Sequence, residues 1–210
     1  SKVFMGKTYA ETGEQEGVQA LKDLTRQSAT AWFLATKLAT HFISDAPKRS
    51  DIRILAEAYG RSGGNLRAMH EALIDMPSMW EDPLQKVKTP YELIVSTLRL
   101  LGDKAQWSDR EYRRLNQTLN HMGHVPFTAL SPAGWPEEEG AWISADSLMN
   151  RLEWVHGQAI KTKNVNDALN IARYFADPVL HEDEKFWIAR APSAAEGLAL
   201  ILASRAHQRR

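Results

Sequence analysis

The sequence predicts an all-α protein, with about eight to nine helices in a single bundle-like domain over residues 1–210. Three observations support this fold class. Apolar residues recur at helical spacing through most of the chain, capping-box patterns mark several helix starts, and no run alternates convincingly between polar and apolar residues. With 210 residues, 43% of them hydrophobic and 25% charged, the chain has the size and composition of a globular domain.

The most apolar helix is expected at residues 29–43, after an irregular start over residues 2–13 and a first helix over 14–27. Its apolar residues cover more than half of the helical wheel, so we expect other helices to bury it on most sides. Lys37 and His41 lie one turn apart on its polar arc. We expect them to pair with acids such as Asp45 or Glu92, or to form an anion-binding pocket.

Local start and stop signals place the remaining helices. The N-cap candidates are Asn65 and either Ser144 or Asp146. Further helices are expected at residues 52–59 and from Asn164 onward. The side chains expected to point inward are Ile160, Ala168, Ile171 and Tyr174. The acidic residues 181–184 are predicted to form a solvated loop, and residues 123–140 a long ordered loop rich in Gly and Pro. Capping boxes open three helices, at Thr89–Glu92, Ser108–Glu111 and Ser193–Glu196.

Composition excludes several classes of function. The 26 basic and 26 acidic residues give zero net charge, which argues against nucleic-acid binding, and we expect the basic residues 205–210 to fray as a tail. Without cysteine there are no disulfides or thiolate sites, and the compartment, cytoplasm or periplasm, stays open. No run is long enough to span a bilayer. The oligomeric state is not predicted.

Several blocks of the sequence form a recognisable set. The most specific is Met-Gly-His-Val-Pro-Phe-Thr-Ala-Leu-Ser-Pro-Ala-Gly-Trp-Pro at residues 122–136. The others lie at residues 29–47, 62–73, 76–80, 86–102, 141–144 and 148–152. Together and in this order, the blocks resemble a bacterial family catalogued as domain of unknown function 1800.

The resemblance implies a helical domain matching the C-terminal half of the family, so we expect the chain to be part of a longer protein. It departs from the family pattern at Gln27-Ser28, where His-Pro is usual, and at His124, where Gln often stands. The resemblance supplies no agreed activity and no catalytic residues.

The strongest binding candidate is the loop Gly134-Trp135-Pro136, together with Trp142 after it. Glycine permits unusual backbone angles and proline stiffens the exit, so Trp135 is either displayed as a ligand platform or packed as a plug. Most of the seven tryptophans are expected in the core.

Two arginines and two histidines complete the candidates. Arg99 and Arg151 stand on otherwise apolar helical stretches, where a guanidinium suits a carboxylate, a phosphate or the carbonyls of a helix end. His121 and His124 are weak metal candidates, because their spacing fits zinc but no third ligand follows at a known spacing. No phosphate loop, dinucleotide fingerprint or nucleophile elbow is present, so no cofactor is expected.

These observations leave three hypotheses. The leading one is a binding module of a larger protein, for a small ligand or a protein partner, with the Gly-Trp-Pro loop at its functional face. The alternative is a hydrolase-type enzyme that uses Lys37, His41 and Arg151 in one pocket beside that loop. The third is a purely structural helical scaffold.

Overall fold

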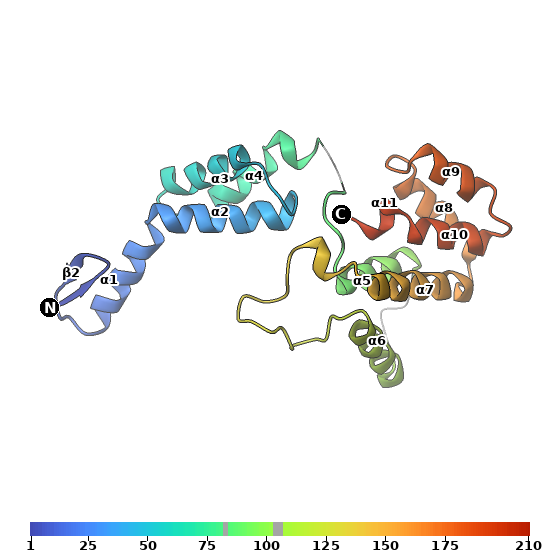
Figure 1. Ribbon diagram of the computed structural model, residues 1–210, viewed down its shortest axis with the longest axis horizontal. Helices are drawn as coiled ribbons and strands as arrows, with labels where there is room; N and C mark the ends of the chain where they lie inside the picture. The colour runs from blue at the N-terminus through green and yellow to red at the C-terminus, as the bar shows by residue number, and fades with distance from the viewer. Residues whose placement is uncertain (82–83, 103–106) are drawn as a thin grey trace. The chain divides into compact units, whose positions relative to one another are not determined.

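The structure is a computed structural model that describes residues 1–81, 84–102 and 107–210 (Figure 1). The all-α fold class is confirmed, and these ranges hold eleven α-helices, more than the eight to nine expected. Contacts concentrate in two compact units, unit 1 (residues 1–83) and unit 2 (residues 84–210), which are described separately. A single domain over residues 1–210 stays a prediction. No helix in the described ranges is both long and apolar enough to cross a membrane.

Unit 1 is a β-hairpin followed by four α-helices and a short 3-10 turn. The hairpin corrects the expectation of an irregular start. Met5 and Gly6 adopt the positive φ angles that a two-residue hairpin turn needs, and strands of three residues are too short for a visible alternation. The elements are β1 (Lys2–Phe4), β2 (Lys7–Tyr9), α1 (Glu14–Thr25), α2 (Ser28–Phe42), α3 (Arg49–Arg61), α4 (Leu66–Ile74) and η1 (Pro77–Met79).

The core of unit 1 lies between α2, α3 and α4. The helix α2 buries a stripe of small residues, Ala31, Ala35 and Ala39, which lets α3 approach closely. Within this unit the expectation of burial on most sides is wrong, because Trp32 keeps 37% of its surface exposed and Phe42 keeps 41%. The apolar count around a helical wheel does not reveal that the fully buried positions of α2 are alanines, while Leu34 and Leu38 pack against the core only partly buried.

Unit 2 is assembled around the central helix α10, which packs on α7, α8 and α9. Leu198 and Leu202 of α10 are fully buried and share a core with Val155 and Ala172. The elements are α5 (Pro90–Leu100), α6 (Asp109–His121), η2 (Glu139–Ala141), α7 (Ala145–Lys161), α8 (Val165–Ala176), α9 (Glu182–Ala189), α10 (Ala194–Ala203) and α11 (Arg205–Gln208).

Helix α9 replaces the solvated loop expected at residues 181–184. The Glu184 carboxylate accepts the backbone N–H of His181 at 2.8 Å, and the acidic residues occupy the first helical turn. Negative charge is stabilising there, so the acidic cluster is a helix-start signal.

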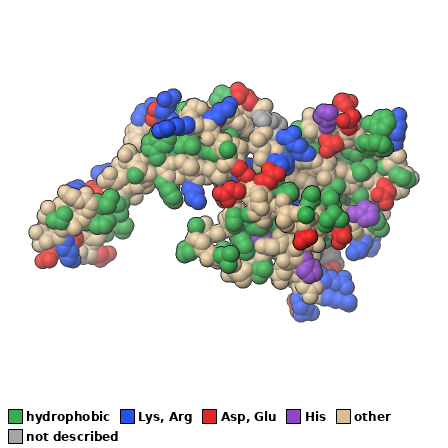
Figure 2. Space-filling view, viewed as in Figure 1, with side chains coloured by type: hydrophobic (Ala, Val, Ile, Leu, Met, Phe, Trp, Pro, Cys, Tyr) green, Lys and Arg blue, Asp and Glu red, His purple; other side chains and the backbone are tan. Residues whose placement is uncertain are grey.

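Some predicted inward positions are wrong. Tyr174 is 77% exposed, and Ile160 and Ile171 are also exposed, because α8 and α7 pack through smaller residues such as Ala168, Ala172 and Ala159. Hydrophobic side chains therefore remain visible on the surface of the molecule (Figure 2). The tryptophans follow the same trend: all seven are described, and Trp142 alone is classed as buried.

Candidate functional site

A short antiparallel pairing between the segment before α5 and the C-terminal residues organises the candidate site. The backbone N–H of Arg210 donates to the carbonyl of Lys86 at 2.8 Å, and that of Lys88 donates to the carbonyl of Gln208 at 3.0 Å. The expected fraying of residues 205–210 is therefore wrong. The partners of these residues lie far away in the sequence, so local composition cannot reveal them.

Arg151 of α7 forms hydrogen bonds with both segments of this pairing. Its side chain is fully buried, Nη2 donates to the carbonyl of Lys88 at 2.6 Å, and Nη1 donates to Oε1 of Gln208 at 3.3 Å. Burial lowers the pKa of Arg151 to about 10, with the negative charge of Glu92 acting in the opposite sense. Arg151 is thus committed to internal hydrogen bonds that join α7, the segment before α5 and the C-terminal residues.

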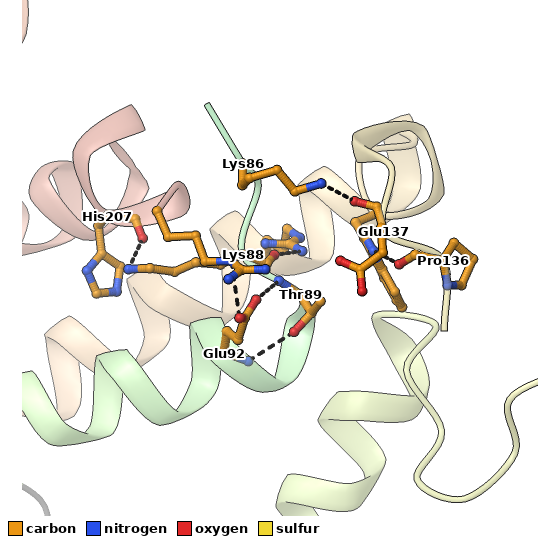
Figure 3. A network of polar contacts seen from close by, with 10 residues as sticks. Lys86, Lys88, Thr89, Glu92, Pro136, Glu137 and His207 are labelled. Atoms are coloured by element: carbon orange, nitrogen blue, oxygen red, sulfur yellow. Dashed lines mark hydrogen bonds and ion pairs between the residues drawn. The ribbon is translucent and has the colours of Figure 1, made fainter. Parts of the chain in front are cut away.

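Glu92 is the acid at the centre of this polar network (Figure 3). Its Oε2 accepts the backbone N–H of Thr89 at 2.8 Å in the capping box that starts α5, as predicted. Its Oε1 lies 3.2 Å from Nε of Arg210. Glu92 therefore serves a helix cap and an ion pair at once.

The Gly-Trp-Pro loop is attached to the same segment. The buried side chain of Lys86 donates from Nζ to the carbonyl of Glu137 at 2.6 Å, directly after the loop (Figure 3). The indole N–H of Trp142, which is 3% exposed, donates to the carbonyl of Pro136 at 3.0 Å. These bonds hold the exit of the loop in place.

Trp135 itself is half-buried. Its ring centroid lies 4.9 Å from that of His124 and 5.9 Å from that of Trp142, so three aromatic rings pack together. Gly134 is exposed and has a φ of 92°, a backbone conformation that favours glycine. A direct role of Gly134, Trp135, Pro136 or Trp142 in ligand binding stays a prediction.

Beside the network, unit 2 contains a cleft of about 430 Å³. One side is polar and carries Lys88, Ser96, Arg99 and His207. The other side is apolar and comes mainly from α8, with one residue each from α5, α10 and α11. Its residues are Leu100, Ile171, Ala172, Phe175, Ala176, Ile201 and Ala206.

Lys88 and His207 meet in the cleft through a short hydrogen bond. Nζ of Lys88 donates to the backbone carbonyl of His207 at 2.6 Å (Figure 3). Burial lowers the pKa of Lys88 to about 8, and nearby Glu92 acts in the opposite sense. The His207 ring lies 2.8 Å from Oγ1 of Thr97, and burial, with a contribution from Lys88, lowers its pKa to about 3. His207 is therefore neutral at physiological pH.

Arg99 stands at the exposed part of the cleft. Its guanidinium makes no hydrogen bond or ion pair with the residues that the structure describes. The described lining includes no aspartate or glutamate. The cleft therefore offers two cations, Lys88 and Arg99, next to an apolar wall.

The remaining candidates lie elsewhere. Lys37 is exposed and His41 half-buried on α2 of unit 1, and Glu92, one of their expected partners, is paired with Arg210 in unit 2. His121 lines a smaller cleft with Asn150, whereas His124 packs between Trp135 and Trp142. Within the described ranges no three His, Asp or Glu side chains are placed to hold a metal ion.

Comparison with protein families supplies the classification. The model of a family described as "Protein of unknown function (DUF1800)" matches residues 1–209. The chain belongs to this family. Comparisons with curated proteins and with solved structures find no match. The resemblance predicted from the sequence blocks is thereby confirmed, and the description of the DUF1800 family assigns no activity.

In this DUF1800 chain, sequence reasoning found part of the site. It singled out Arg99 and Arg151, but it missed Lys86, Lys88 and His207. The one local signal is the alternation Lys86-Val-Lys88 directly before the capping box, which is typical of an extended segment entering a helix. Nothing local to His207 marks it as buried.

Proposed function

We propose that unit 2 is a binding module for a small organic anion, held in the cleft between α5, α8 and α10. The observation that carries the proposal is the lining of this cleft, which combines Lys88 and Arg99 with an apolar wall and no acidic side chain among the described residues. A ligand with a carboxylate or phosphate group and a hydrophobic body matches both sides.

The size of the cleft supports a small molecule as the ligand. Pockets that bind such ligands range from about 300 to 1,000 Å³, and this cleft of about 430 Å³ lies near the lower end. An arginine fork suits a planar carboxylate because it can donate two parallel hydrogen bonds. Arg99 is suited to this role because its guanidinium makes no hydrogen bond or ion pair with the described residues.

Other clefts of the chain favour an anion less. The cleft of about 370 Å³ in unit 1 is lined by Arg26 and Arg53 but also by Glu57, which lies 4.0 Å from Arg53. The cleft beside α7 and α10 contains Glu153 and the pair of His156 and Glu196.

The hydrolase alternative has less support. It requires Lys37, His41 and Arg151 in one pocket, yet Arg151 is committed to Lys88 and Gln208 inside unit 2. A protein partner at the Gly-Trp-Pro loop also stays a prediction. We also propose that the chain is a module of a larger protein.

Isothermal titration calorimetry with 4-methylbenzoate tests the proposal. This probe carries one carboxylate on a small apolar body. We expect saturable binding at one site, weakened about tenfold by Arg99→Ala because a charge-assisted hydrogen bond is lost. The neutral 4-methylbenzamide should bind more weakly than the acid.

Arg113→Ala is the matched control, since Arg113 is an exposed arginine on α6 outside the cleft. It should leave the affinity for 4-methylbenzoate unchanged. The proposal fails if no saturable binding is seen, or if both arginine variants bind the probe as the wild type does.

A further inference from the structure

We propose that Lys88 reacts reversibly with an aldehyde that carries a carboxylate or phosphate group, forming an imine inside the cleft. This inference rests on the proposed function, because the same cleft must first hold the anionic group. It adds a covalent step and names the substrate class as anionic carbonyl compounds.

The position of the Lys88 amine supports this assignment. Lys88 lies on the polar side of the cleft, next to an apolar wall that includes Ala172 and Phe175. Its Nζ is anchored by one hydrogen bond to the carbonyl of His207. In the neutral amine that bond uses one N–H and leaves the nitrogen lone pair available for attack.

The surroundings also favour the neutral amine. Burial lowers the pKa of Lys88 to about 8, so a substantial fraction is unprotonated in mildly alkaline solution. A lysine desolvated in this way is the usual form of an imine-forming nucleophile in proteins. Lys86, although almost fully buried, is bonded to Glu137 and is not among the cleft residues.

The reaction balances without a further reactant. The Lys88 ammonium loses a proton to solvent, and its nitrogen attacks the aldehyde carbon to form a C–N bond. The carbonyl oxygen leaves as water, and a proton returns to give the protonated imine. This product keeps one N–H for the carbonyl of His207, and its positive charge remains near Glu92.

Reductive trapping on the full chain tests the inference. The chain is incubated at pH 7.5 with 4-carboxybenzaldehyde and cyanoborohydride, and the modified lysines are located by peptide mass spectrometry. We expect Lys88 to be labelled at least about tenfold faster than the exposed Lys161, because burial lowers the pKa of Lys88 and the cleft holds the anionic probe beside its amine. Arg99→Ala and excess 4-methylbenzoate should each slow the labelling of Lys88.

Two variants serve as controls. Lys88→Arg cannot form the imine, so the label at position 88 should vanish while circular dichroism shows that the fold is retained. Lys161→Arg should leave the labelling of Lys88 unchanged. If Lys88→Arg does not fold, the labelling of Lys88 in the wild type is measured with and without excess 4-methylbenzoate. Slower labelling supports the imine in the cleft, and unchanged labelling contradicts it.

The outcomes separate the two proposals. If 4-methylbenzoate binds but the label spreads evenly over exposed lysines, the imine is overturned and the proposed function stands. If 4-methylbenzoate does not bind and Lys88 is not labelled preferentially, both are overturned. Preferential labelling of Lys88 that depends on Arg99 supports both.

Discussion

At the scale of single residues, Arg151 shows how a buried charge can be structural. It is fully buried, and its two terminal nitrogens bond the carbonyl of Lys88 and the side chain of Gln208. The sequence marks Arg151 as unusual because it interrupts an apolar helical stretch. It does not tell whether a ligand or the protein itself satisfies the guanidinium.

Replacing Arg151 should therefore destabilise the fold. We expect Arg151→Ala to lower the free energy of unfolding by about 3–5 kcal/mol, since it opens a cavity and leaves buried carbonyls without donors. Chemical denaturation of both proteins measures the difference. Arg113→Ala on exposed α6 should change it by less than about 0.5 kcal/mol. Equal, small effects of both variants would contradict the structural role of Arg151.

His207 should make stability depend on pH. Its pKa is about 3 in the folded chain and about 6.5 when unfolded, so between these values the unfolded state binds one more proton. The free energy of unfolding of the wild type should fall as the pH is lowered through this window, by about 1.4 kcal/mol per pH unit from this group.

The variant His207→Gln isolates this contribution. Glutamine can still bond Thr97 but does not titrate, so its stability curve should be flatter between about pH 6 and pH 4. Carboxylates titrate in both proteins, so their contribution cancels when one curve of unfolding free energy against pH is subtracted from the other. Parallel curves for wild type and variant would show that His207 is not the buried neutral group described here.

At the scale of elements, the residues at which helices start were predictable from the sequence, and the contacts between helices were not. The capping boxes at Thr89 and Ser108 are confirmed, because each depends on side chains only three residues apart. The pairing of residues 86–88 with residues 208–210 depends on chain closure over more than a hundred residues. Periodicity also misplaced Tyr174, because α8 makes its buried contact through three alanines and Leu169.

Helix α10 allows a direct test of the packing in unit 2. Leu198 is fully buried in its core, whereas Leu200, two residues later, is 40% exposed. Leu198→Ala should lower the free energy of unfolding by about 2–5 kcal/mol, and Leu200→Ala by less than about 1 kcal/mol. If thermal and urea denaturation gave equal losses for the two variants, the orientation assigned to α10 would be wrong.

At the scale of the whole molecule, the zero net charge conceals a local excess of cations. Lys88 and Arg99 line one cleft, although acidic and basic residues are equal in number over the chain. Global composition argues against a nucleic-acid surface, which stays a prediction, and it carries no information on a single cleft. The candidate site therefore could be predicted only in part, through Arg99 and Arg151.

The two cores should report separately on stability and binding. Leu55 is fully buried in the core of unit 1, so Leu55→Ala should lower stability by about 2–5 kcal/mol. The described residues that line the binding cleft all belong to unit 2. At a temperature where the variant is folded, calorimetry should give an unchanged affinity for 4-methylbenzoate. A large loss of affinity would contradict the assignment of the cleft to unit 2 alone.

The most direct test of the central claim is a crystal structure of the chain with 4-bromobenzoate, whose bromine is located by anomalous scattering. The account predicts the carboxylate within hydrogen-bond distance of the Arg99 guanidinium. The bromine should lie against the apolar wall that includes Ile171 and Phe175. A probe found at another cleft, or one that leaves this cleft empty at saturating concentration, would contradict the account.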